Sequence, residues 1–174
     1  MDKNWDEIEV KAMEYTEDNM RNRGMNCAES VFEALIRSGA VDVPVEAAAY
    51  ATGFGGGGGG VGFTCGALAS AILANSIVHG RKYPESADRT VLKQRFYMRY
   101  NNLVSDFVKV AGSGLCREIV NAFPGGYKDP DTRSNCIRIS VEAARLAVDY
   151  LRRDAEEAAL LEYDPDVVGT NNWF

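Results

Sequence analysis

The four cysteines of this chain are the residues whose type and placement point most directly to chemistry. Each is predicted to lie at or within one turn of the start of a helix: Cys27 after Asn26, Cys65 after Thr64, Cys116 just beyond Gly114, and Cys136 after Asn135. Free backbone N–H groups and the positive end of the helix dipole lower the pKa of a thiol from about 8.5 toward neutrality. We therefore predict thiolates, the form that binds metals, attacks disulfides and carries redox chemistry.

The spacing of the cysteines includes no C-x-x-C pair, so neither the zinc-ribbon nor the ferredoxin pattern applies. Any site must therefore be assembled by the fold. Four thiolates match the ligand number of an iron–sulfur cluster, which is the first hypothesis. The second is a thiol–disulfide redox protein, and the third is a structural zinc–thiolate site in a non-enzymatic helical protein. The remaining alternative holds no cofactor and treats the cysteines as small buried apolar residues.

A glycine run directly before Cys65 is the second informative feature. Glycine loses more conformational entropy than other residues when it becomes ordered, so such a run is expected where side chains cannot be tolerated. We predict an ordered loop around the site, whose N–H groups approach a cofactor or a thiolate sulfur. The run lacks the Gly-Lys-Ser/Thr ending of a phosphate-binding loop, and no strand precedes it. The glycines assigned to cofactor binding are Gly55, Gly56, Gly57, Gly58, Gly59, Gly60 and Gly66.

Length and charge restrict the class of protein. A chain of 174 residues suits a single domain, over residues 1–174, that can bury a core without disulfides. The net charge of −6 argues against nucleic acid or an anionic membrane as a partner. The charged first residues do not resemble a secretory signal, and no apolar run is long enough to span a bilayer. We expect a cytoplasmic protein that exchanges electrons with a partner protein or a small molecule.

Helical patterns dominate the sequence, and the alternation typical of strands is nearly absent. We predict an all-α bundle of five to seven helices, with the cysteine-bearing helix starts gathered at one end. Apolar faces on two of the longer helices could also serve a homodimer. No catalytic residue is assigned. The only histidine, His79, is predicted near the end of a helix, where its ring would interact favourably with the helix dipole. The expected helices cover residues 5–23, 26–39, 44–53, 64–80, 86–110, 116–122 and 135–161. An irregular tail over residues 162–174 offers Trp173 and Phe174 for contact with a partner.

The motifs around the cysteines resemble a known family. The order is NCAE at Cys27, a glycine-rich stretch running into TCGA at Cys65, GLCRE at Cys116, and Cys136 opening the final helix. This order, over about residues 26–146, resembles the redox-active family named for its motif, C_GCAxxG_C_C. Gly66 and Ala67 complete the core motif, and Ser70 stands where the motif ends in glycine. The resemblance implies a helical protein of anaerobic bacteria or archaea. It also implies electron transfer, with an iron–sulfur centre held by the four thiolates.

Overall fold

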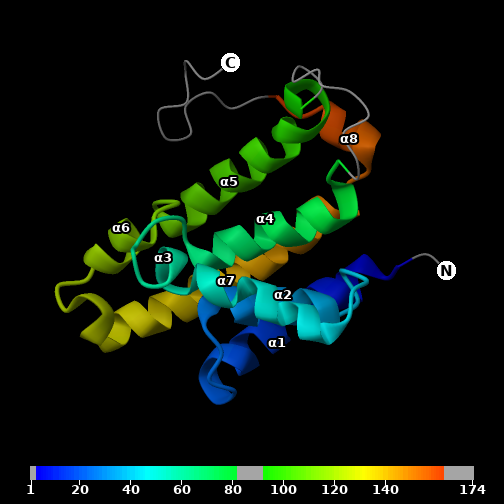
Figure 1. The fold of residues 1–174 in the computed structure, drawn as a ribbon. Coiled ribbons are helices and arrows are strands. Elements are labelled where there is room, and N and C mark those ends of the chain that lie inside the picture. Colours follow the sequence, from blue (N-terminus) through cyan, green and yellow to red (C-terminus); the bar gives the residue numbers. More distant parts are fainter. Residues whose placement is uncertain (1–2, 82–91, 163–174) are drawn as a thin grey trace.

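The computed structural model describes residues 3–81 and 92–162, which form an all-α fold as predicted (Figure 1). These ranges contain eight α-helices and no strand. The count exceeds the predicted five to seven for two reasons. The pattern did not indicate a helix at Gly55–Gly58, and the predicted helix over 135–161 is interrupted after Arg152, so that Ala155–Ala159 form a separate helix. The α-helices are α1 (Trp5–Asn22), α2 (Cys27–Arg37), α3 (Gly55–Gly58), α4 (Gly66–His79), α5 (Met98–Ala111), α6 (Cys116–Asn121), α7 (Pro130–Arg152) and α8 (Ala155–Ala159).

Three further helical segments connect the α-helices: the 3-10 helices η1 (Val45–Phe54) and η3 (Gly126–Lys128), and the π-helix η2 (Leu92–Tyr97). The predicted helix over 44–53 is therefore of the 3-10 type. The start of the predicted helix over 86–110 lies outside the described residues. The predicted tail, with Trp173 and Phe174, lies outside them as well, except for residue 162. No helix in the described ranges is both long and apolar enough to cross a membrane.

Local capping explains where the cysteine-bearing helices begin. α2 begins as predicted, because the side chain of Asn26 accepts hydrogen bonds from the N–H groups of Ala28 and Glu29. In return, the Glu29 carboxylate accepts a hydrogen bond from the N–H group of Asn26, which completes a capping box. α7 begins at Pro130 rather than at Asn135, so the prediction for this helix was wrong. The side chain of Asp129 caps it, and proline is favoured in the first helical turn.

The predicted cap of α4 was also wrong. Cys65 itself occupies the N-cap position. Thr64 instead forms an isolated antiparallel bridge with Leu115, in the segment that precedes α6.

The helix α7 is the centre of the bundle, since it packs against α1, α2, α4 and α5. In Figure 1 it runs lengthwise behind α4 and below α5, with α3 and α6 near its beginning and α8 beyond its other end. The core between these helices consists largely of small and branched apolar residues. Large side chains that are almost fully buried include Phe32, Leu35, Leu68, Leu103, Phe107, Ile139 and Tyr150.

Two side chains, Arg99 and His79, contact the C-terminal end of α7. Arg99 of α5 is only 4% exposed, and its guanidinium donates to three backbone carbonyl oxygens, those of Tyr150, Arg153 and Asp154. His79, at the end of α4, has Nε2 at 2.8 Å from the carbonyl oxygen of Leu151. Carbonyl groups at a helix end lack partners within the helix, so these two residues satisfy the end of α7.

Ser70 shows how this chain accommodates a residue other than the glycine of the motif. It is fully buried, and its hydroxyl group donates to the carbonyl oxygen of Ala28 at 2.8 Å, which joins α4 to α2. We expect Ser70→Ala to lower the free energy of unfolding by about 1 kcal/mol, the usual net worth of such a hydrogen bond. Urea unfolding followed by circular dichroism would measure the change.

The matched control is Ser76→Ala on the same helix, because the Ser76 hydroxyl donates to Ile72 O within α4 and links no second helix. We expect this variant to stay within about 0.5 kcal/mol of the parent. Equal losses in the two variants would contradict a role for Ser70 in joining the helices.

Candidate functional site

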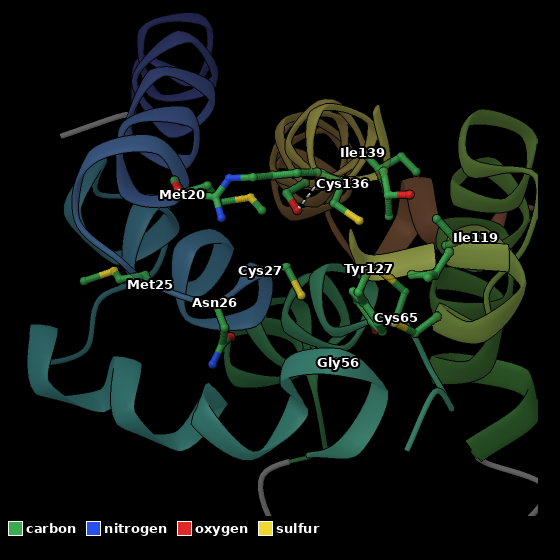
Figure 2. A pocket seen from close by; sticks show the side chains of 15 residues that line it. Met20, Met25, Asn26, Cys27, Gly56, Cys65, Ile119, Tyr127, Cys136 and Ile139 are labelled. Carbon is green, nitrogen blue, oxygen red and sulfur yellow. Dashed lines mark hydrogen bonds between the residues drawn. The ribbon is translucent and has the colours of Figure 1, made fainter. Parts of the chain in front are cut away.

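All four cysteines line one cavity of about 280 Å³. Cys27 is the first residue of α2, Cys65 the N-cap of α4, and Cys116 the first residue of α6. Cys136 lies in the second turn of α7, not at its start, because that helix begins earlier than predicted. Figure 2 shows Cys27, Cys65 and Cys136 around the cavity, with Tyr127 and Gly56 beside them. The structure thus brings together the four predicted ligands, and no disulfide joins them.

A short backbone pairing fixes two of the cysteines relative to each other. The N–H group of Cys65 donates to Gly114 O at 2.8 Å, and that of Cys116 donates to Phe63 O at 2.7 Å. Both bonds flank the bridge between Thr64 and Leu115. The segments before α4 and α6 are therefore paired by backbone hydrogen bonds. This pairing places Cys65 and Cys116 on the same cavity although they are far apart in sequence.

The glycine run forms a left-handed turn. Gly56, Gly57 and Gly59 have φ values of 64°, 73° and 67°, and the N–H groups of Gly60 and Gly62 close the turn onto Gly55 O and Gly56 O. An L-residue in this conformation costs about 1–2 kcal/mol, whereas glycine adopts it freely. The run was predicted to be ordered, and the left-handed path explains why successive glycines are needed.

The glycines play different roles at the site. Gly56 lines the cavity. Gly57 is buried, and a Cβ there would lie 2.8 Å from Cβ of Cys116 and 2.6 Å from the backbone nitrogen of Phe63. A Cβ on Gly66 would lie 2.9 Å from Sγ of Cys27. Gly56 alone of the seven glycines predicted to bind a cofactor lines the cavity. Gly57 and Gly66 lie behind it against cysteine side chains, Gly55 faces Asn26, and the other three, Gly58, Gly59 and Gly60, are exposed.

Backbone N–H groups point at two of the sulfur atoms. Cys27 receives such groups from Gly56, Ala28 and Ala67, and Cys65 receives two from the first turn of α4. N–H groups directed at sulfur stabilise a thiolate and tune any metal centre that it holds. Of the glycines predicted to direct an N–H group at sulfur, Gly56 does so toward Cys27.

The expected lowering of the thiol pKa values was nevertheless wrong for three of the cysteines. Burial, followed by the charge of neighbouring thiolates, raises the pKa of Cys65 to about 12 and that of Cys136 to about 11. Burial also raises the pKa of Cys27, against the effect of its N–H donors. The prediction considered only the helix ends and omitted desolvation and the mutual repulsion of gathered thiolates.

These shifts predict slow alkylation of the reduced protein when nothing is bound. Because only the thiolate reacts, the rate at Cys136 is expected to rise about tenfold per pH unit and to level off only near its pKa of about 11. Iodoacetamide labelling followed by peptide mass spectrometry would give this profile, with N-acetylcysteine as the reference thiol. A plateau near the usual thiol pKa of about 8.5 would contradict the prediction.

Two cavity residues, Tyr127 and Thr132, were missed by the sequence analysis. The hydroxyl oxygen of Tyr127 lies 2.7 Å from Sγ of Cys116. Burial, and then the bond to Cys116, raises the pKa of Tyr127, so this phenol stays protonated. Thr132 is 1% exposed, and its hydroxyl oxygen has no hydrogen-bond partner among the described residues. With α7 beginning at Pro130, Thr132 and Cys136 share a helix face at i and i+4, a signal that the misplaced start concealed. No pattern indicated Tyr127.

Among the described residues, the four thiols line one cavity but do not form a preassembled site for one metal ion. No three His, Cys, Asp or Glu side chains of residues 3–81 and 92–162 are placed to hold one metal ion. The cavity, the four thiols and the partnerless hydroxyl of Thr132 suit a bound group that fills the space between them.

Comparison with known protein families identifies one match. Residues 25–150 match the family described as "Putative redox-active protein (C_GCAxxG_C_C)". No curated protein and no solved structure matches the chain. The match extends from the residue before Asn26 to Tyr150 of α7, so it includes all four cysteines, the glycine turn and most of the bundle. The chain therefore belongs to the redox-active protein family named for the C_GCAxxG_C_C motif.

Proposed function

We propose that the protein is an electron carrier whose four cysteines hold an iron–sulfur cluster. One observation carries the proposal: four thiols from four separate segments line a single cavity of about 280 Å³. Such a group supplies reversible one-electron chemistry when bound. The proposed ligands are Cys27, Cys65, Cys116 and Cys136.

The chain's own residues account for the rest of the proposed centre. Glycine at positions 57 and 66 lets the backbone pass close to Cys116 and Cys27. The N–H group of Gly56 and the hydroxyl group of Tyr127 supply hydrogen bonds to sulfur. Apolar side chains, among them Ile119, Val120 and Ile139, line the cavity. Hydrogen bonds to sulfur and exclusion of water are the means by which proteins set the potential of such centres. Electrons would pass to a partner protein or a small molecule.

The test is purification without oxygen, with determination of iron, sulfide and zinc and a visible spectrum before and after dithionite. We expect iron and sulfide, with broad absorption that bleaches on reduction. Cys136→Ala is expected to lose much of both, whereas Ser134→Ala, at an exposed position on the same helix, keeps them. A protein that holds neither iron nor sulfide, even after anaerobic reconstitution, refutes the proposal.

The other outcomes of this experiment identify the alternatives. One equivalent of zinc in a colourless protein would indicate a structural thiolate site, whose removal should unfold the domain. A colourless, metal-free protein in which oxidation links one defined pair of cysteines would indicate thiol–disulfide chemistry. Peptide mapping after oxidation separates that case from random pairing.

A further inference from the structure

The side chain of Tyr127 lies at the edge of the cysteine cavity, partly exposed to solvent. It belongs to η3, between α6 and α7, and these two helices carry Cys116 and Cys136. Its hydroxyl group contacts Sγ of Cys116 at 2.7 Å, while the residue as a whole is 60% exposed. A Cβ on Gly56 would lie 3.8 Å from the same hydroxyl oxygen, so the phenol reaches inward beside the glycine turn.

The position of Tyr127 is set by the cap that begins α7. The carboxylate of Asp129 accepts the N–H group of Asp131 at 2.9 Å and, with its other oxygen, lies 3.4 Å from the N–H group of Gly125. Gly126, directly before the tyrosine, has a φ of 54° and completes the turn. The Asp129 side chain thus caps the helix that carries Cys136 and also holds the turn that positions Tyr127.

We propose that Tyr127 is a positioning residue of the cysteine centre, with two roles. Its hydroxyl group donates a hydrogen bond that holds the sulfur of Cys116, and its ring covers that sulfur against solvent. The first role rests on the proposed function, because it concerns the potential of the loaded centre. The second role, covering the sulfur, does not depend on a bound group. A donor to a ligand sulfur stabilises the reduced, more negative state, so it raises the reduction potential.

Two variants separate the roles. Tyr127→Phe removes the hydroxyl group and keeps the ring, whereas Tyr127→Ala removes both. In the reduced protein with nothing bound, we expect Tyr127→Ala to increase the rate of Cys116 alkylation several-fold and Tyr127→Phe to leave it near the parent rate. In the reconstituted protein, we expect Tyr127→Phe to shift the reduction potential to a more negative value. Tyr50→Phe is the control, since Tyr50 is 75% exposed and does not line the cysteine cavity.

Each measurement can overturn its own part of the inference. An unchanged potential in Tyr127→Phe overturns the hydrogen-bonding role, and so does an equal shift in Tyr50→Phe. An unchanged alkylation rate of Cys116 in Tyr127→Ala overturns the covering role. If the protein takes up no iron or sulfide, the proposed function and the hydrogen-bonding role fall together, while the alkylation comparison still decides the covering role.

Discussion

Gly57→Ala is expected to lower the free energy of unfolding by about 2–5 kcal/mol. The left-handed conformation, with a φ of 73°, costs an L-residue about 1–2 kcal/mol. The overlap of the new methyl group with Phe63 N and Cys116 Cβ adds about 1–3 kcal/mol, as in other overpacked cores. Urea unfolding monitored by circular dichroism would measure the loss. The displaced Cys116 should also reduce the iron and sulfide content after reconstitution.

The same glycine-rich segment supplies two controls for this prediction. Gly59 has a φ of 67° but open space around it, so Gly59→Ala should cost only the conformational term of about 1–2 kcal/mol. Gly53 has neither a positive φ nor a neighbour within 4 Å, so Gly53→Ala should be neutral or stabilising by about 0.4–1 kcal/mol. If Gly57→Ala and Gly59→Ala lose the same stability, close packing against Cys116 is not what requires glycine at position 57.

Arg99→Ala is expected to cost about 3 kcal/mol of unfolding free energy. The guanidinium is buried and donates to three carbonyl oxygens where α7 ends and α8 begins. Hydrogen bonds from a charged donor contribute about 1.5–3 kcal/mol each, and water that enters the vacated space recovers part of the loss. Thermal and urea unfolding would measure the effect.

Two substitutions test whether the position of Arg99 or merely its charge matters. Arg21→Ala removes an exposed arginine paired with Glu17 on α1 and should change stability by less than about 0.5 kcal/mol. Arg99→Lys keeps the charge but lacks the planar fork that reaches several carbonyl groups, so an intermediate loss is expected. A loss in Arg99→Ala no larger than that in Arg21→Ala would contradict the capping role.

The parts of the fold that were predictable are those specified by local chemistry. α2 begins where expected, because Asn26 and Glu29 form a capping box that depends only on neighbouring residues. The beginning of α7 was misplaced, since Asp129 and Pro130 suit a turn and a helix start equally well. Which of the two forms is decided by how α7 packs against the rest of the bundle, and the sequence pattern does not contain that information.

The cysteines of the candidate site could be identified from the sequence, but their environment could not. The cysteines could be identified by type, and their gathering on one cavity agrees with the expectation of a site assembled by the fold. Their pKa values could not be predicted, because burial and mutual repulsion depend on tertiary distances. Tyr127 was missed for the same reason: its contact with Cys116 joins residues that no helical or strand periodicity relates.

The dispersal of the four cysteines over α2, α6, α7 and the cap of α4 has a consequence for biosynthesis. Cys136 belongs to the central helix, which is synthesised after the segments that carry the other three cysteines. Until α7 docks, the cavity lacks the residues that α7 contributes, and the other three cysteines belong to an incompletely folded bundle. Any cofactor that needs all four cysteines can therefore be bound only after α7 has docked. A centre that binds only the finished fold would also prolong the cellular lifetime of the molecules that carry it, since binding to the native state lowers the population exposed to proteolysis.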